Sequence, residues 1–341
     1  MKYLFLVITF FCIVNLAQAQ TSDEFANNGR LKYNSGDYSG AIQDNNKAIE
    51  LDPKNVEAYY GLALSKSQLK DYRGAIQDFS KIIELNPSFG QAFYYRGIMK
   101  SDLEDYRGSI QDYTKAIELD PNYAEAYYNR GVAKVQLNDY VDAKQDFSKS
   151  IDLDPTELLH YYALALSNSQ LKDYSLAIEG YTKVIELDPN FVEAYNKRAN
   201  AKQNINDYIG AIKDYSKSIE LEPTELIGYA NRGSLKSKLK DYRGAIQDFS
   251  KVIELDPSQA MMYYNCGELK QKLKDYKGAI QDYSKFIELD FTILGYYEGA
   301  YFNRGLCKIF LGDKDSGCLD LSKAGELGDE EAYDAIKKYC N

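Results

Sequence analysis

The seven prolines of this chain follow one another at a constant interval of 34 residues (for example, from 53 to 87). They are Pro53, Pro87, Pro121, Pro155, Pro189, Pro223 and Pro257. A fixed period of this length indicates a repeat architecture, in which each unit packs mainly against its neighbours. Because a proline cannot continue a helix, each one predicts a helix end. The next proline would fall at position 291, which is Phe291.

Each repeat contains two stretches with helical spacing of apolar and small residues. Residues 124–157 are a clear copy. Its first stripe consists of Tyr127, Gly131, Lys134 and Leu137, and its second of Ala143, Phe147, Ser150 and Ile151. Two helices of about a dozen residues, repeated along the chain, predict an αα-solenoid.

The period, the small residue in the first helix, the small residue and aromatic in the second, and the closing proline resemble the tetratricopeptide repeat (TPR) family. The resemblance covers about 22–331 and implies an all-α fold, a right-handed αα-superhelix of about nine helix-turn-helix repeats with a C-terminal capping helix. We expect a signal peptide at 1–19, the solenoid at 20–329 and the capping helix at 330–341. The repeats are placed at 22–55, 56–89, 90–123, 124–157, 158–191, 192–225, 226–259, 260–293 and 298–331.

Small residues recur at one position of each helix. The first helix has Gly29, Ala63, Gly97, Gly131, Ala165, Ala199, Gly233, Gly267 and Gly305. The second has Ala41, Ala75, Ser109, Ala143, Ala177, Ala211, Ala245, Ala279 and, in repeat 9, Cys318. Helices approach closely only where side chains are small, so we interpret these positions as structural.

A charged set recurs in five repeats: an arginine in the first helix, a lysine four residues later and an aspartate in the second helix. The arginines are Arg96, Arg130, Arg198, Arg232 and Arg304. Repeat 5 has Leu164, Asn168 and Gly180 instead. The joint loss of all three favours an ion-pair ladder between the two helices, although a basic strip that binds anions is an alternative.

The N-terminus has the pattern of a secretory signal peptide. Lys2 precedes an apolar run at 3–16, and Ala17-Gln18-Ala19 provides small residues before a cleavage site at Gln20. An uncleaved anchor is the alternative, but the run is short for a membrane span. The lysine-, asparagine- and tyrosine-rich repeats also resemble exported TPR proteins of Bacteroidetes-type bacteria. We therefore expect a periplasmic or secreted protein with no membrane span after cleavage.

The composition argues against nucleic-acid binding and against catalysis. The formal net charge is −10, whereas phosphate contacts need basic patches. His160 is the single histidine, and we predict it to be a surface residue. No Cys/His spacing indicates a metal site, and no glycine-rich phosphate loop occurs, so no metal or cofactor is expected.

Four cysteines follow the predicted cleavage site: Cys266, Cys307, Cys318 and Cys340. Four cysteines allow three pairings, among which the sequence does not choose. Cys340 ends the expected capping helix, so a disulfide between Cys318 and Cys340 would hold this helix on the last repeat. Free buried thiols are the alternative.

In TPR proteins the first helices line a concave groove that holds a peptide or a partner's helix. The resemblance places eight residues of repeats 2 to 5 in this groove. They are Tyr60, Leu64, Tyr94, Ile98, Tyr128, Val132, Tyr162 and Leu166. Tyrosine suits a binding surface because it is largely apolar with a polar tip. Packing of these tyrosines against neighbouring helices is the alternative.

Repeat 9 is irregular, because Phe291 replaces the proline and an insertion follows it. This region is apolar and aromatic, and it forms a second candidate patch. Its members are Phe291, Tyr296, Tyr297, Phe302, Leu306 and Phe310. Such a cluster either binds a partner or packs onto the chain's own groove.

The sequence thus predicts a non-catalytic scaffold that binds a peptide or helix of a partner protein in its concave groove. A structural or assembly component of a cell-envelope complex, acting through the convex face or the termini, is the alternative. Self-association remains open.

Overall fold

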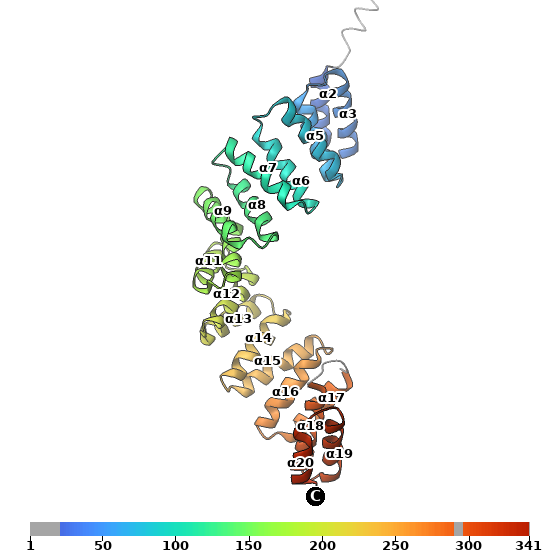
Figure 1. Ribbon diagram of the computed structural model, residues 1–341, viewed down its shortest axis with the longest axis vertical. Coiled ribbons are helices and arrows are strands. Elements are labelled where there is room, and N and C mark those ends of the chain that lie inside the picture. Colours follow the sequence, from blue (N-terminus) through green and yellow to red (C-terminus); the bar gives the residue numbers. More distant parts are fainter. Residues whose placement is uncertain (1–20, 290–295, 341) are drawn as a thin grey trace, which may run out of the picture. The chain divides into compact units, whose positions relative to one another are not determined.

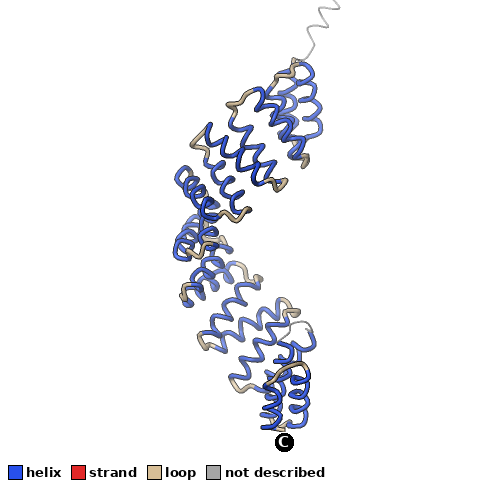
Figure 2. Tube along the Cα trace, viewed as in Figure 1, coloured by secondary structure: helices blue, strands red, loops and turns tan. Residues whose placement is uncertain are grey.

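The computed structural model describes residues 21–289 and 296–340. These residues form nineteen helices, and no strand occurs among them (Figures 1 and 2). The predicted signal peptide at 1–19 and Phe291 lie outside the described residues. The predicted all-α fold of helix-turn-helix repeats is confirmed.

Nine helix pairs run through the described residues, and α20 (Glu331–Tyr339) follows them. The first helices are α2 (Ser22–Asn34), α4 (Val56–Gln68), α6 (Gly90–Asp102), α8 (Ala124–Gln136), α10 (Leu158–Gln170), α12 (Val192–Asn204), α14 (Leu226–Lys238), α16 (Ala260–Lys272) and α18 (Tyr296–Phe310). The second helices are α3 (Tyr38–Leu51), α5 (Tyr72–Leu85), α7 (Tyr106–Leu119), α9 (Tyr140–Leu153), α11 (Tyr174–Leu187), α13 (Tyr208–Leu221), α15 (Tyr242–Leu255), α17 (Tyr276–Leu289) and α19 (Lys314–Glu326).

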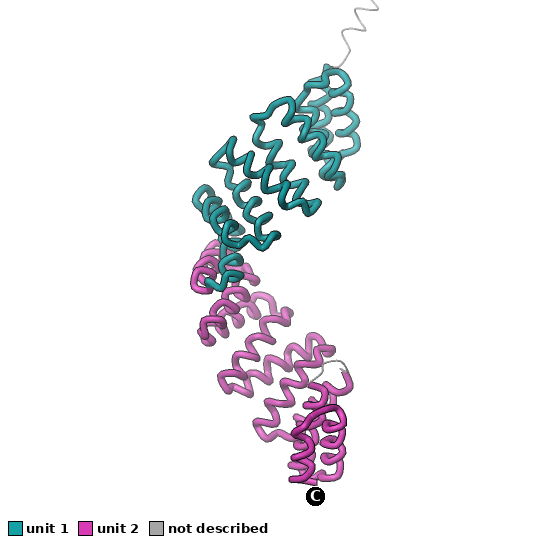
Figure 3. The backbone as a smooth tube through the Cα atoms, in the orientation of Figure 1, with its two compact units in different colours: residues 1–173 teal, residues 174–341 magenta. Residues whose placement is uncertain are grey.

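The chain divides into two compact units, Met1–Asp173 and Tyr174–Asn341 (Figure 3). The first unit contains α2 to α10, and the second contains α11 to α20. Within each unit, every helix packs against the helices that precede and follow it in the chain. None of the described helices combines the length and the apolar character needed to cross a bilayer.

The local sequence explains where the second helices begin and end. Asp105 precedes α7, and its carboxylate accepts a hydrogen bond from the Gly108 N–H at 2.9 Å. This is an N-cap, which satisfies a backbone donor that the helix itself cannot pair. At the other end, α7 stops at Leu119, and Asp120 takes an extended conformation before Pro121. The residue before a proline favours such a conformation, as the proline spacing predicted.

The small residues of the first helices lie against aromatic rings of the second helices. A Cβ atom added to Gly131 would come within 2.7 Å of the Phe147 ring, and one added to Gly97 within 2.7 Å of the Tyr113 ring. Real Cβ atoms do not approach so closely, so glycine allows the two helices to pack at this distance. These glycines are structural, as expected.

Repeat 9 corrects one detail of the sequence alignment. The fourth residue of α17 is the buried Ala279, and the fourth residue of α19 is Gly317. Gly317, and not Cys318, therefore occupies the small position: a Cβ on Gly317 would lie 2.7 Å from the Gly305 carbonyl oxygen. Cys318 is the next residue and points elsewhere. The helix α18 also begins at Tyr296, two residues before the predicted start of the repeat.

The ion-pair ladder is present in the structure. Arg130 donates two hydrogen bonds to the Asp146 carboxylate, at 3.0 and 2.6 Å, and the Lys134 ammonium lies 2.7 Å from the same carboxylate. A third nitrogen of Arg130 donates to the Thr114 hydroxyl in the preceding repeat, at 3.1 Å. In four further repeats the equivalent aspartate pairs with the arginine and lysine of its own repeat. These aspartates are Asp112, Asp214, Asp248 and Asp320. The ladder thus joins helices within and between repeats.

The cysteines fall into two groups. Cys318 in α19 and Cys340, directly after α20, form a disulfide with a Cα–Cα distance of 5.9 Å. Cys266 and Cys307 are free and buried, and burial raises the pKa of each thiol to about 12. No group of three or more His, Cys, Asp or Glu side chains in the described part of the chain could hold a metal ion.

Candidate functional site

The predicted groove residue Tyr60 lies in a cluster of aromatic rings. Its ring centroid is 6.0 Å from Phe79, 5.9 Å from Phe89 and 5.8 Å from Tyr95. Tyr95 also stacks on Phe79, with centroids 5.9 Å apart and ring planes at 11°. Between repeats 2 and 3 the space above the buried Phe79 is therefore filled by side chains of the chain itself.

Tyr94 is held in a similar way between repeats 3 and 4. Its ring lies 4.6 Å from Tyr123 and 5.9 Å from Tyr113, measured between centroids. The Tyr94 hydroxyl accepts a hydrogen bond from the Asn129 side chain at 2.8 Å. Tyr60 and Tyr94 thus pack against their own chain, although both keep part of their surface exposed.

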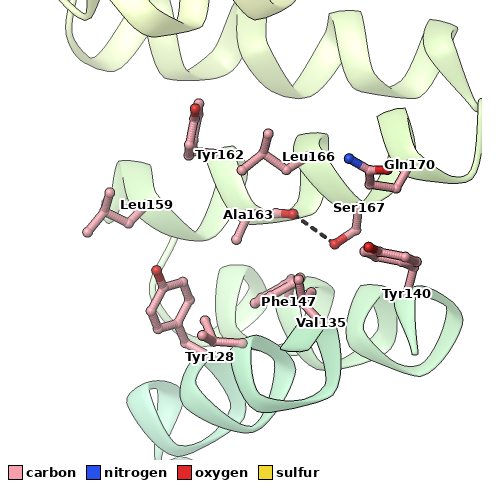
Figure 4. Close-up of a pocket in the computed structure, with 11 residues that line it drawn as sticks. Tyr128, Val135, Tyr140, Phe147, Leu159, Tyr162, Ala163, Leu166, Ser167 and Gln170 are labelled. Atoms are coloured by element: carbon pink, nitrogen blue, oxygen red, sulfur yellow. Dashed lines mark hydrogen bonds between the residues drawn. The ribbon is translucent and has the colours of Figure 1, made fainter. Parts of the chain in front are cut away.

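Between repeats 4 and 5 the same region is open and forms a pocket of about 400 Å³ (Figure 4). We call it the repeat-5 pocket. It is lined by Tyr128, Val132 and Val135 from α8, Tyr140 and Phe147 from α9, and Leu159, Tyr162, Ala163, Leu166, Ser167 and Gln170 from α10. Figure 4 shows the α10 residues on one side and those of α8 and α9 on the other. Four predicted groove residues, Tyr128, Val132, Tyr162 and Leu166, meet here.

Two sequence differences between equivalent positions of the repeats explain why this pocket is open. Residues two repeats apart correspond, so Phe147 corresponds to Phe79 and Tyr128 to Tyr60. The ring that covers Phe79 belongs to Tyr95, but position 163 is alanine. The ring of Phe89 contacts Tyr60, but position 157 is glutamate. Loss of these two rings leaves the space above Phe147 empty.

The rim of the pocket is apolar at a position where the other repeats of the first unit are polar. Leu159 is 44% exposed. Its equivalents in repeats 2, 3 and 4 are Glu57, Gln91 and Glu125. Leu159 thus extends the apolar lining of the pocket to its rim.

His160 is buried, which contradicts the prediction of a surface residue. Only 3% of it is exposed, and its ring centroid lies 5.0 Å from that of Tyr128. The cause is its helix position, which other repeats fill with the fully buried Ala58, Ala92 and Ala126. The imidazole therefore packs against the Tyr128 ring and does not line the repeat-5 pocket.

Glu157 lies at the start of α10, beside the pocket. Its carboxylate accepts a hydrogen bond from the Leu159 N–H at 3.3 Å. Burial, and then the negative charge of Glu157, raise the pKa of the Tyr128 hydroxyl. The repeat-5 pocket thus has an acidic group at the end where α10 begins.

The second candidate patch packs against its own chain at several points. Tyr296 lies 5.1 Å from Tyr264 in α16, measured between ring centroids. Phe310 lies 5.3 Å from Tyr276 in α17 and 6.0 Å from Tyr339 in α20. Phe302 and Leu306 are half-buried, and Tyr297 packs against the core around Tyr283. These contacts give the aromatic residues of α18 a structural role.

Sequence reasoning missed several residues of the repeat-5 pocket, notably Tyr140, Phe147, Leu159 and Ala163. The prediction followed one stripe of the first helices, whereas the floor of the pocket comes from the second helix. A comparison of position 163 with Tyr95, and of position 157 with Phe89, would have found the missing rings.

Family comparisons agree with the helix pairs. The TPR repeat model matches residues 29–69 and 101–138, and three tetratricopeptide repeat models match 56–89, 124–157, 161–191, 181–213, 228–259 and 260–292. The chain belongs to the tetratricopeptide repeat family. TPR repeats are protein-interaction modules, so the chain is a protein-interaction scaffold. A search of curated protein sequences found no significant match.

Solved structures show the same fold. The C-terminal part of a TPR repeat-containing protein from Cytophaga hutchinsonii is 21% identical, with a TM-score of 0.64 over 70% of this chain and 98% of that one. A tetratricopeptide repeat protein from Parabacteroides merdae is 18% identical, with a TM-score of 0.52 over 74% and 100%. YrrB, described as a TPR protein with an unusual peptide-binding site, is 24% identical, with a TM-score of 0.50 over 54% and 94%.

Proposed function

We propose that this TPR protein is a non-catalytic scaffold that binds a peptide or helix of a partner protein on the first-helix face of repeats 4 and 5. The observation that carries the proposal is the repeat-5 pocket above Phe147. Between repeats 2 and 3 the ring of Tyr95 fills the equivalent space above Phe79. The open form in repeat 5 is therefore not a requirement of the repeat.

The lining of the pocket indicates what it binds. Aromatic and aliphatic side chains form most of it, and its polar groups are tyrosine hydroxyls, Ser167 and Gln170. Apolar pockets with a few polar groups bind apolar groups, and large apolar side chains supply most of the energy of protein interfaces. At about 400 Å³, the pocket has room for one or two such side chains. YrrB supports peptide binding as a use of a fold of this kind.

The same lining argues against catalysis at this site. None of the described residues that line the pocket is a carboxylate, an imidazole or an amine. The Ser167 hydroxyl donates to the Ala163 carbonyl oxygen at 3.0 Å, as a serine within a helix commonly does. An activated nucleophile would need a base within hydrogen-bonding distance.

The substitution Ala163→Tyr tests the proposal. Because Tyr95 occupies the equivalent position, the fold should accept this tyrosine, whose ring would cover Phe147 and close the pocket. Peptides selected from a random-sequence phage-display library against the full chain provide the probe, and fluorescence anisotropy of the labelled peptides measures affinity. We expect Ala163→Tyr to lower the affinity at least about tenfold, since it removes the central apolar contact.

The control is Ala163→Asn, which copies Asn129 of repeat 4 and should keep most of the binding because it leaves much of the space free. Circular dichroism and thermal melting show whether both variants fold. Equal affinity of the parent chain and a folded Ala163→Tyr variant would contradict the proposed site.

A further inference from the structure

A comparison of two equivalent glutamates shows that Glu157 is available to a ligand. Glu157 opens α10, and Glu225 opens α14 two repeats later. The Glu225 carboxylate accepts hydrogen bonds from the Asn196 side chain at 3.0 Å, the Gly228 N–H at 3.3 Å and the Ser218 hydroxyl at 3.4 Å. Glu225 is thus satisfied inside its own unit.

The groups that satisfy Glu225 are either replaced or bonded elsewhere around Glu157. The His160 N–H, which corresponds to that of Gly228, donates to the Glu157 backbone carbonyl oxygen at 3.2 Å. Asn196 corresponds to Tyr128, and the Ser150 hydroxyl, which corresponds to that of Ser218, donates to the Phe147 carbonyl oxygen at 2.8 Å. The Leu159 N–H donates to the Glu157 carboxylate, and Glu157 remains exposed. Over the part of the chain that the structure describes, no lysine or arginine is paired with it.

The Glu157 carboxylate makes the end of the pocket where α10 begins acidic. The whole chain has a formal net charge of −10. A ligand that fills the apolar pocket and extends past the start of α10 therefore meets the negative charge of Glu157.

We propose that the repeat-5 pocket recognises a peptide segment with a large apolar side chain flanked by a lysine or arginine, whose cation pairs with Glu157. This inference rests on the proposed function and adds the chemistry of the partner. The apolar side chain supplies most of the affinity, and the charged pair on the rim selects basic over acidic segments. The exposed Glu157 carboxylate, which accepts one hydrogen bond where that of Glu225 accepts three, gains a partner on binding.

The test uses the peptides selected from the random-sequence library. We expect them to carry lysine or arginine beside a large apolar residue. Glu157→Gln keeps the side-chain length and an oxygen that can accept the Leu159 N–H, so α10 should stay folded. It should lower the affinity about two- to fivefold, as the loss of a solvent-exposed ion pair does. Glu225→Gln is the matched control and should leave the affinity for the peptide unchanged.

A double-mutant cycle links the effect to the peptide's cation. If the peptide's lysine or arginine is replaced by glutamine, Glu157→Gln should cause no further loss of affinity. The parent chain's affinity should also fall with added salt more steeply than that of the Glu157→Gln variant.

Three outcomes would overturn the inference. Peptides that Ala163→Tyr blocks but Glu157→Gln does not affect would leave the pocket as the binding site and remove the basic specificity. Peptides that bind Ala163→Tyr as tightly as the parent would show that the proposed site itself is wrong. Self-association that sedimentation detects and Ala163→Tyr abolishes would identify a second copy of this chain as the occupant.

Discussion

Asp146 is the clearest case of a single residue on which the packing of a repeat depends. It is 3% exposed and lies between the cations of Arg130 and Lys134. Removing one member of a buried set leaves charges without partners, which costs more than the set itself contributes. The sequence allowed this role to be predicted because the arginine, lysine and aspartate disappear together in repeat 5.

Asp146→Asn should therefore lower the free energy of unfolding by about 3 kcal/mol, because two cations then share a neutral partner. Chemical denaturation followed by circular dichroism measures the change. Glu118→Gln is the control, since Glu118 pairs with Lys115 on an exposed surface and should contribute less than about 0.5 kcal/mol. Similar effects of the two substitutions would argue against the structural role of the ladder.

The buried tyrosines predict a loss of stability in alkali. Burial raises the pKa of Tyr94 and of Tyr264 from 10.0 to about 12. A phenol with a raised pKa in the folded chain holds its proton more tightly there, so the unfolded chain ionises first as the pH rises. The stability should be complete below about pH 10 and decline between about pH 10 and 12. Denaturation curves at pH 9, 10.5 and 11.5 measure this decline.

Tyr94→Phe removes one of these groups and should make the decline shallower. Absorbance of tyrosinate near 295 nm should likewise rise at higher pH in the folded chain than in denaturant. A folded chain whose tyrosines all titrate near pH 10 would refute the account of their burial.

Two residue-level errors show what the sequence could not decide. His160 was predicted at the surface because it is a lone histidine with no distinctive motif around it, but its position in the helix is one that packs inward. Cys318 was assigned to the small position of repeat 9, where Gly317 stands. Both residues are small enough for that position. The insertion before repeat 9 breaks the constant spacing of the repeats, so the alignment could not decide between them.

At the level of helices, the turn between the two helices of a repeat contains a residue with positive φ. Gly36 and Gly312 occupy it in repeats 1 and 9, with φ of 84° and 91°. In repeats 2 to 8 the same position holds lysine, glutamate or asparagine, with φ between 61° and 65°. Residues with a Cβ atom adopt this conformation at a cost, whereas glycine adopts it readily.

Glu104→Gly should therefore stabilise the chain by about 0.5–1 kcal/mol, because it relieves the φ of 61° at the end of α6. The opposite substitution, Gly312→Ala, should destabilise it by about 1 kcal/mol. Midpoints of denaturation for both variants measure the effects. Destabilisation by Glu104→Gly would show that chain entropy outweighs the strain at this turn.

Helix ends and helix pairs were the most predictable elements. Aspartates before the second helices act as N-caps, and prolines two residues after these helices fix their ends. In the repeats with a proline, the bounds of the second helix could therefore be predicted from the local sequence alone. In repeat 9 the insertion after Phe291 breaks the 34-residue spacing, so the alignment placed the start of the repeat at residue 298, whereas α18 begins at Tyr296.

At the level of the whole molecule, the period of 34 residues predicted the fold, but it could not predict the binding site. A feature that every repeat shares is needed for packing, so it carries little information about a partner. The repeat-5 pocket arises from what one repeat lacks, namely the rings of Tyr95 and Phe89 at positions 163 and 157. The sequence shows both differences, but their consequence follows only once the structure shows that the ring of Tyr95 covers Phe79 and that of Phe89 contacts Tyr60.

The position of a bound peptide tests the central claim most directly. Leu159 is exposed on the rim of the repeat-5 pocket, and Ile227 is the exposed equivalent residue two repeats later. We would replace each in turn with the photo-crosslinking amino acid benzoylphenylalanine and irradiate the chain with a selected peptide. Mass spectrometry should then find the peptide joined to position 159 through or next to its large apolar residue, and not to position 227. Equal crosslinking at both positions, or crosslinking at 227 alone, would contradict the account.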